Sequence, residues 1–248
     1  MPTIRDFLAG AAAPCPASVP TLQGTCVYAI GGADGTPDYH DTVEAYSPAT
    51  NTWATLPSMP TARAFLTGAA APCPASVPTL QGTCVYAIGG DDGSDIVSTV
   101  EAYSPATDTW ETLPSMPTAR YSPAGAAAPC PAGLTNTCVY AIGGDSYSGF
   151  LDTAEAYAPA TNTWVTLPSM PTARSGPAGA AAPCPEASNG PCVYVVGGEK
   201  ASTGSLSDFV NTAEAFAIER ASDPQPPLPC PHGPHGKCPP KPRPHPRH

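Results

Sequence analysis

Residues 84–120, CVYAIGGDDGSDIVSTVEAYSPATDTWETLPSMPTAR, decide the fold because close copies of them lie before and after. Their first seven residues, CVYAIGG, also occur at 26–32 and 138–144, and the variant CVYVVGG occurs at 192–198. The copies begin 58, 54 and 54 residues apart. A period near 50 residues is typical of repeat architectures, in which each unit buries its faces against its neighbours.

Each unit predicts four short strands separated by turn residues. In the second unit we expect strands at about 65–71, 84–88, 99–103 and 109–112. The first is rich in small residues, which suits strands crowded around an axis; the second ends at a Gly pair, which permits backbone angles closed to other residues. The repeats predict one domain over residues 1–219. Its units span about 1–58, 59–115, 116–169 and 170–218.

The glycine pair, followed by a tyrosine and then by a tryptophan seven positions later, resembles the kelch repeat. The matching residues are Gly31, Gly32, Tyr46 and Trp53; Gly89, Gly90, Tyr103 and Trp110; and Gly143, Gly144, Tyr157 and Trp164. The fourth unit has Gly197 and Gly198, but Phe216 replaces the tyrosine and no tryptophan follows. The resemblance implies an all-β propeller with one four-stranded blade per repeat, the last blade lacking its outer strand. Kelch propellers usually have six or seven blades, so a closed four-bladed ring, an open arc and part of a larger ring remain open.

Charge excludes some classes of partner. The formal net charge is -10, and residues 1–223 hold all 20 acidic residues but only six basic ones. Phosphate binding needs clustered lysine and arginine, so we expect no nucleic-acid partner. No apolar run approaches the roughly 20 residues that span a bilayer, so we expect no membrane insertion. Met1 aligns with Met59, Met116 and Met170, which suggests a fragment of a longer protein.

Ten cysteines form five pairs in the sequence. Four pairs flank the connection between the first two strands of a unit, where antiparallel neighbours bring the two ends of the connection together. We therefore predict hairpin disulfides, with free buried thiols as the alternative. The predicted pairs are Cys15 with Cys26, Cys73 with Cys84, Cys130 with Cys138, Cys184 with Cys192, and Cys230 with Cys238. Disulfides indicate an oxidising compartment, so we expect an extracellular or cell-surface protein, although no export signal is visible.

Residues 220–248 form a separate tail. Eleven prolines lie in 224–248 and no strand pattern is present, which predicts a disordered or extended segment. Cys230, His232, His235 and Cys238 offer four soft ligands, but a disulfide or a segment without a role is favoured over metal capture. We predict no metal and no cofactor.

One face of the propeller is the predicted binding surface. In an antiparallel four-stranded blade, the loop between strands two and three emerges beside the link from strand four to the next blade. Varied loops on a rigid scaffold usually carry binding. The predicted binding residues are Arg5, Arg63, Arg120 and Arg174 of the links, and Asp34, Asp91, Asp92 and Asp145 of the loops. The alternative is structural: the arginines pair with Glu44, Glu101, Glu155 and Glu214 of the third strands, and the aspartates belong to ordinary turns.

We interpret the chain as a non-catalytic binding module for a protein or carbohydrate partner. Copper chemistry and nucleophilic triads need histidine, and His40 is the only histidine before the tail. A carbohydrate-active enzyme resembling the sugar mutarotases is an alternative, because the predicted face combines arginine with carboxylates. A purely structural extracellular repeat is a third interpretation.

Overall fold

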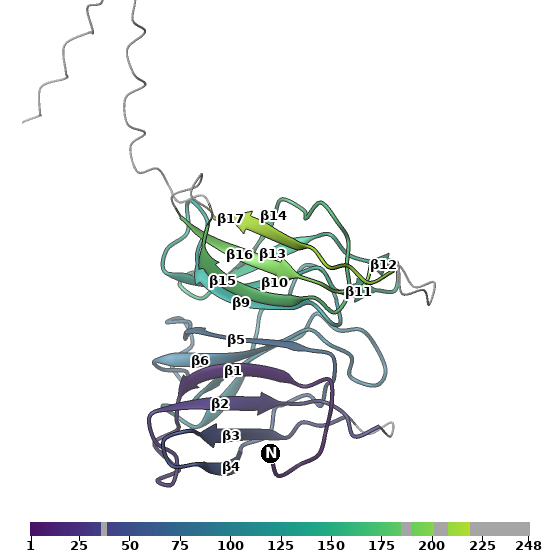
Figure 1. Cartoon of the computed structure of the whole chain (residues 1–248). Helices are drawn as coiled ribbons and strands as arrows, with labels where there is room; N and C mark the ends of the chain where they lie inside the picture. The colour runs from purple at the N-terminus through teal and green to yellow at the C-terminus, as the bar shows by residue number, and fades with distance from the viewer. Residues whose placement is uncertain (36–38, 185–189, 201–207, 219–248) are drawn as a thin grey trace, which may run out of the picture.

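The structure, a computed structural model, describes residues 1–35, 39–184, 190–200 and 208–218. These residues fold into three four-stranded antiparallel sheets and one three-stranded sheet, with no α-helix among them. Each sheet is one blade of a β-propeller, and Figure 1 shows the blades following one another from β1 to β17. The predicted all-β propeller is confirmed, and the fourth blade has three strands among the described residues.

Each blade is a meander that begins at the inside of the propeller. Blade 1 contains β1 (Ala9–Pro14), β2 (Thr25–Ile30), β3 (Val43–Ser47) and β4 (Thr52–Leu56), and blade 2 contains β5 (Thr67–Pro72), β6 (Thr83–Ile88), β7 (Val100–Ser104) and β8 (Thr109–Leu113). Blade 3 contains β9 (Ala124–Pro129), β10 (Thr137–Ile142), β13 (Ala154–Ala158) and β14 (Thr163–Leu167), and blade 4 contains β15 (Ala178–Pro183), β16 (Pro191–Val196) and β17 (Ala213–Ala217). A small hairpin of β11 (Asp145–Ser146) and β12 (Gly149–Phe150) stands in the loop of blade 3. The predicted tail at 220–248 lies outside the described residues.

The inner strands β1, β5, β9 and β15 lie side by side around the axis. Small side chains are needed there because the backbones approach closely. A Cβ atom on Gly68 would lie 3.1 Å from the carbonyl oxygen of Gly10, and one on Gly179 would lie 2.6 Å from that of Gly125. The recurrent Gly-Ala-Ala-Ala segment therefore sets how tightly the blades can gather.

Neighbouring blades pack through two kinds of sheet face. The leading face, which contacts the preceding blade, carries Val85, Ala87 and Tyr103 in blade 2. The trailing face, which contacts the following blade, carries Tyr28 and Ile30 in blade 1, and these residues share one hydrophobic cluster with that leading face. The same contact recurs between blades 2 and 3 and between blades 3 and 4. Each internal interface is thus a leading face on a trailing face.

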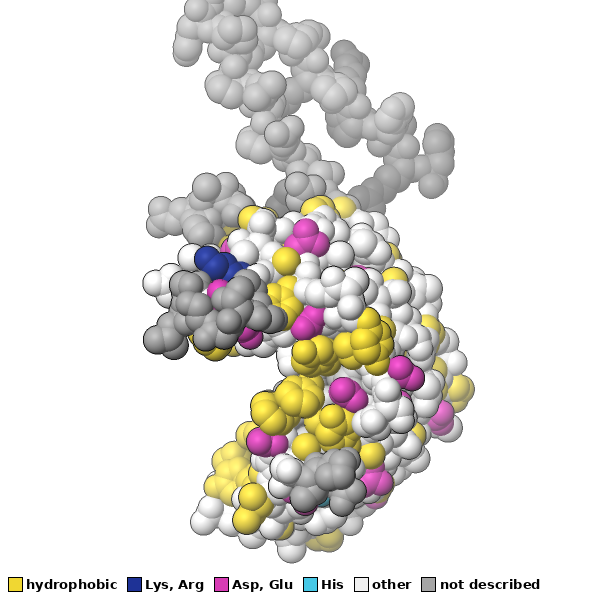
Figure 2. Space-filling view, turned by 90° about the vertical axis from the view of Figure 1, so that its right-hand side faces the viewer, with side chains coloured by type: hydrophobic (Ala, Val, Ile, Leu, Met, Phe, Trp, Pro, Cys, Tyr) yellow, Lys and Arg dark blue, Asp and Glu magenta, His cyan; other side chains and the backbone are white. Residues whose placement is uncertain are grey.

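The four blades form an arc with a notch between the first and the last, as Figure 2 shows in a view onto the loops. Of the architectures left open by the sequence, the chain adopts the open arc. No helix in the described part of the chain is long and apolar enough to cross a membrane.

Four hairpin disulfides fasten the first two strands of the blades. The bonds are Cys15–Cys26, Cys73–Cys84, Cys130–Cys138 and Cys184–Cys192, with Cα atoms 4.8 to 5.0 Å apart. Strand register explains the pairing, because Ala13 lies opposite Cys26 and Cys15 follows one residue beyond the end of β1. The predicted pair Cys230 and Cys238 lies outside the described residues.

Candidate binding face

The links between blades share an unusual turn on the loop face. The residue two positions after each link arginine has a positive φ: 52° at Phe7, 56° at Phe65, 51° at Ser122 and 65° at Gly176. This left-handed conformation is unfavourable for phenylalanine and persists only where surrounding contacts compensate. Here the compensation is a chain of backbone hydrogen bonds: the N–H of Phe65 donates to Phe7 O at 2.8 Å, and the N–H of Ser122 donates to Phe65 O at 2.7 Å. Gly176 continues the series by donating to Ser122 O at 2.9 Å.

Because these turns point successive side chains around the axis, aromatic rings line the inner rim of the face. The rings of Phe7 and Phe65 stack with centroids 4.1 Å apart, and Tyr121 meets Phe65 edge-on at 5.7 Å. Phe7 is 53 % exposed. Hydrophobic side chains accordingly gather beside the notch in Figure 2. The sequence analysis did not identify this aromatic row, although its signal was the variable residue one or two places after each arginine.

The four link arginines lie inside the blades. Arg63 pairs with Glu101 at 2.8 Å, Arg120 with Glu155 at 3.0 Å and Arg5 with Glu44 at 3.1 Å, and Arg174 pairs with Glu214. The four arginine side chains have no exposed surface.

Three of the guanidinium groups, those of Arg63, Arg120 and Arg174, also donate to backbone carbonyls at the ends of a loop. Arg63 donates to the carbonyl oxygens of Gly89 at 2.6 Å and Thr99 at 3.0 Å, at the two ends of the loop between β6 and β7. Burial lowers the pKa of Arg63, while the neighbouring Glu101 opposes that shift. Structural pairing, the alternative from the sequence, is therefore what the structure contains, and a ligand on the loop face does not meet these arginines.

The loop aspartates lie on the face and take part in turns. Asp91 Oδ1 accepts from the Gly93 N–H at 2.7 Å, and Asp92 Oδ1 accepts from the N–H groups of Ser94 and Asp95 at 2.9 Å. Asp34 is on the loop of blade 1, 3.8 Å from the imidazole of His40. The aspartates thus stabilise turns, as the structural alternative expected, and they also lie on the surface of the loop face.

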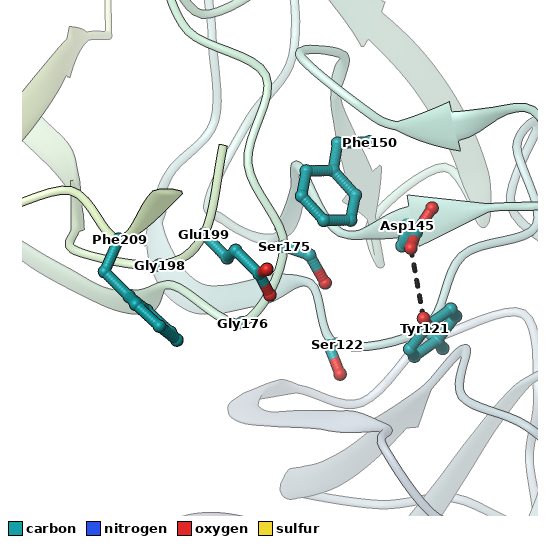
Figure 3. A pocket seen from close by; sticks show the side chains of 9 residues that line it. All are labelled: Tyr121, Ser122, Asp145, Phe150, Ser175, Gly176, Gly198, Glu199 and Phe209. Carbon is teal, nitrogen blue, oxygen red and sulfur yellow. Dashed lines mark hydrogen bonds between the residues drawn. The ribbon is translucent and has the colours of Figure 1, made fainter. Parts of the chain in front are cut away.

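The face is hollowed between blades 3 and 4. A groove of about 410 Å³ is lined by Tyr121, Asp145, Phe150, Ser175, Glu199 and Phe209, with Gly176 and Gly198 among them. Figure 3 shows the Tyr121 hydroxyl directed at Asp145, and this hydroxyl donates to Oδ2 at 3.0 Å. Burial, followed by the hydrogen bond to this carboxylate, raises the pKa of Tyr121. Asp145 is the residue of this groove that the sequence predicted. Phe150 and Phe209 were missed because the loops differ in length, so the place that these two residues share, opposite Asp145 and Glu199, does not align in the sequence.

The arginine pairs leave the surface strongly acidic. In the described ranges the lysines and arginines are Arg5, Arg63, Arg120, Arg174 and Lys200, so Lys200 alone lies outside the buried pairs. No lysine or arginine of the described part forms a salt bridge with Asp91, Asp92, Asp145 or Glu199. The same part contains no cluster of three residues suited to a metal ion. The face consequently offers carboxylates and aromatic rings.

These blades, with their short meanders and variable loops on one face, define a repeat β-propeller. The kelch motif matches residues 14–60, 72–117 and 126–171, which together are more than half of the chain. The chain belongs to the kelch-repeat family.

Two curated relatives are similar over part of the chain. The F-box/kelch-repeat protein SKIP11 of Arabidopsis thaliana is 31% identical over 126 residues, which are 51% of this chain and 24% of that protein. The Kelch-like protein terF of Aspergillus terreus is 30% identical over 170 residues, 62% of this chain and 34% of that protein. The chain thus spans between a quarter and a third of the length of these relatives. Kelch repeats generally mediate protein–protein interaction.

Proposed function

We propose that the chain is a non-catalytic protein-binding module whose loop face receives a basic segment of its partner. One observation carries the proposal: the arginines of all four links form buried pairs with third-strand glutamates, so Asp91, Asp92, Asp145 and Glu199 of the loops form no salt bridge with a lysine or arginine of the described part. Opposite charge steers association and suppresses wrong partners. The partner that fits is therefore cationic.

The aromatic row adds a second attraction. An arginine or lysine placed over an aromatic ring gains about 0.5–2 kcal/mol, depending on its desolvation. Tyr121 contacts Asp145, and Phe65 meets Tyr121 edge-on, so a basic side chain in the groove can meet a ring and a carboxylate together. The rigid hydrogen-bonded links hold these groups in place before binding, which limits the entropy lost on association.

The alternative of a sugar-directed enzyme has lost its main support. That interpretation needed arginine and carboxylate on the same surface, and the four link arginines are inside the blades. Tyr121, Asp145 and Glu199 of the groove remain available for binding, and binding is the role we assign to them.

Anisotropy of a fluorescein-labelled tetraarginine amide tests the proposal. We expect saturable binding that weakens with added salt, and no binding of a matched tetraglutamate peptide. Phe65→Ala and Asp145→Asn should each weaken the complex about threefold to tenfold. Glu111→Gln is the matched control, because it removes one charge from β8, where Thr79 donates to that carboxylate at 2.7 Å, away from the loop face. Equal affinity in all three variants, or equal binding of tetraglutamate, would contradict the proposed face.

We infer that the protein works in an oxidising, extracellular or cell-surface setting. The support is the four hairpin disulfides, since such bonds persist where thiols are not kept reduced. Alkylation of the protein in its native cells, followed by mass spectrometry, should find Cys73 and Cys84 protected from the reagent. Alkylated thiols at these positions would place the protein in a reducing compartment.

A further inference from the structure

The two ends of the arc carry the two halves of one interface. We propose that the trailing face of blade 4 binds the leading face of blade 1 in a second copy of this chain, head to tail. This surface is separate from the loop face, and the inference does not depend on the proposed function. It rests on two apolar faces, one pair of backbone groups and one methionine contact, all closed at every internal blade junction and open at the two ends.

The first open position is on the trailing face of blade 4. Val196 occupies the place of Ile30, Ile88 and Ile142 in the earlier blades. Those isoleucines are 0 to 1 % exposed, whereas Val196 is 47 % exposed. The alanines around it follow the same pattern: Ala178, Ala180, Ala182, Ala213, Ala215 and Ala217 are exposed, while their counterparts in blade 3 are buried. A face built for burial is thus left uncovered by the described residues.

The second open position is on the leading face of blade 1. Val27 corresponds to Val85, Val139 and Val193, which have no exposed surface because each is covered by the blade before it. Val27 itself is 46 % exposed. Tyr46 is likewise half-buried where Tyr103 and Tyr157 are fully buried. This face has the side chains that a trailing face receives elsewhere in the molecule.

The third position is a pair of unmatched backbone groups. At each internal junction, the second glycine of the pair donates its N–H to the carbonyl oxygen of the next link arginine: Gly32 to Arg63, Gly90 to Arg120 and Gly144 to Arg174, all at 2.9 Å. Within the described residues the Gly198 N–H has no acceptor, and the carbonyl oxygen of Arg5 has no donor. One group is on blade 4 and the other precedes blade 1. Head-to-tail docking joins them.

At each internal junction a methionine side chain also packs against the first glycine of the pair, beside this hydrogen bond. The Cε atoms of Met59, Met116 and Met170 lie 3.0 Å from where a Cβ would stand on Gly31, Gly89 and Gly143, and these methionines are buried. At Gly197 no methionine is near, while Met1, which has the same place in its link, is 44 % exposed. Residues 1–5 of a second copy therefore supply both the methionine and the carbonyl that the end of blade 4 lacks.

A second copy is the occupant to which these observations point, because this chain itself holds both halves of every contact. The contact is heterologous: it closes into a ring if the rotation between copies allows and otherwise continues as a filament. Two arcs in one ring would stay within the blade numbers that propellers adopt. Both copies are acidic, so association should strengthen as salt screens their repulsion.

Sedimentation equilibrium on the whole chain in about 0.15 to 0.5 M salt, where the Debye length is about 8 Å or less, tests the proposal. We expect concentration-dependent association that Val27→Glu and Val196→Glu each reduce at least about tenfold, since each places a charge in an apolar contact. Mixing the two variants should restore a 1:1 heterodimer, because each keeps the half that the other has lost. Ser76→Glu on an exposed hairpin of blade 2 is the charge control and should associate like the wild type.

Two further measurements distinguish loss of this interface from unfolding of the variants and from association through another surface. Far-UV circular dichroism and melting temperature must match the wild type in both variants, and the Gly198 amide should exchange hydrogen more slowly as the wild type associates. A chain that stays monomeric at all concentrations, or association that neither variant changes, would overturn the proposal. Failure of the mixed variants to form the heterodimer would also overturn it, since an interface between identical patches would behave in that way.

Discussion

At the scale of single residues, the arginine–glutamate pairs are the feature that most affects function without touching a ligand. Arg63 and Glu101 are both buried, and Thr61 donates a further hydrogen bond to Glu101 at 2.8 Å. The Nε atom of Arg63 has no partner among the described residues, so the pair is not completely satisfied. Buried pairs of this kind add little net stability but are costly to break from one side.

Glu101→Ala should therefore destabilise the fold by about 3–5 kcal/mol, because it leaves the Arg63 guanidinium buried and unpaired. The measurement is the free energy of unfolding in urea. Glu111→Ala, at a partly exposed carboxylate of the same blade, should cost no more than about 0.5 kcal/mol and serves as the control. A cost below 1 kcal/mol for Glu101→Ala would show that the pair does not hold the blade together.

At the scale of elements, the second glycine after each second strand allows the link that enters the same blade to approach. Gly90 has a φ of 100°, and a Cβ there would lie 2.5 Å from the carbonyl oxygen of Ala64. Gly133, in the hairpin of blade 3, has a similar φ of 88° but nothing within 4 Å of the added atom. Comparing alanine substitutions at the two positions distinguishes the cost of backbone strain alone from the cost of strain together with a steric clash.

Gly90→Ala should cost about 3 kcal/mol or more, because strain and the clash with Ala64 act together. Gly133→Ala should cost only about 1–2 kcal/mol, the strain alone. Urea unfolding of both variants checks the difference. Equal costs would mean that the close approach of link and glycine pair does not contribute to packing between blades.

The sequence predicted most of the elements because they depend on local pattern. The strands and the four hairpin disulfides follow from repeated sequence segments and their spacing. The position of the arginine side chains did not follow in the same way, because spacing places Arg63 on the loop face but does not say that its side chain turns inward to Glu101. The turn at Phe65 and the groove at Asp145 depend on contacts between blades, which one repeat does not encode.

At the scale of the whole molecule, the open arc divides the surface into regions with different properties. The loop face combines acidic loops with aromatic rings, and the ends of the arc expose apolar sheet faces that are covered at every internal junction. The loops are held by the buried pairs and the links, so a ligand on the loop face meets a preorganised surface. Association at the ends leaves that surface accessible.

The central claim is that the acidic, aromatic loop face, and not the arginines or the hairpin face, contacts the partner. Titration of the isotope-labelled chain with the tetraarginine amide, followed by amide chemical shifts, tests it most directly. We predict the largest shifts at Ser122, Ser146 and Gly176 of the loop face. Shifts that instead cluster at Gly24 and Gly82, in the cysteine hairpins of the opposite face, would contradict the account.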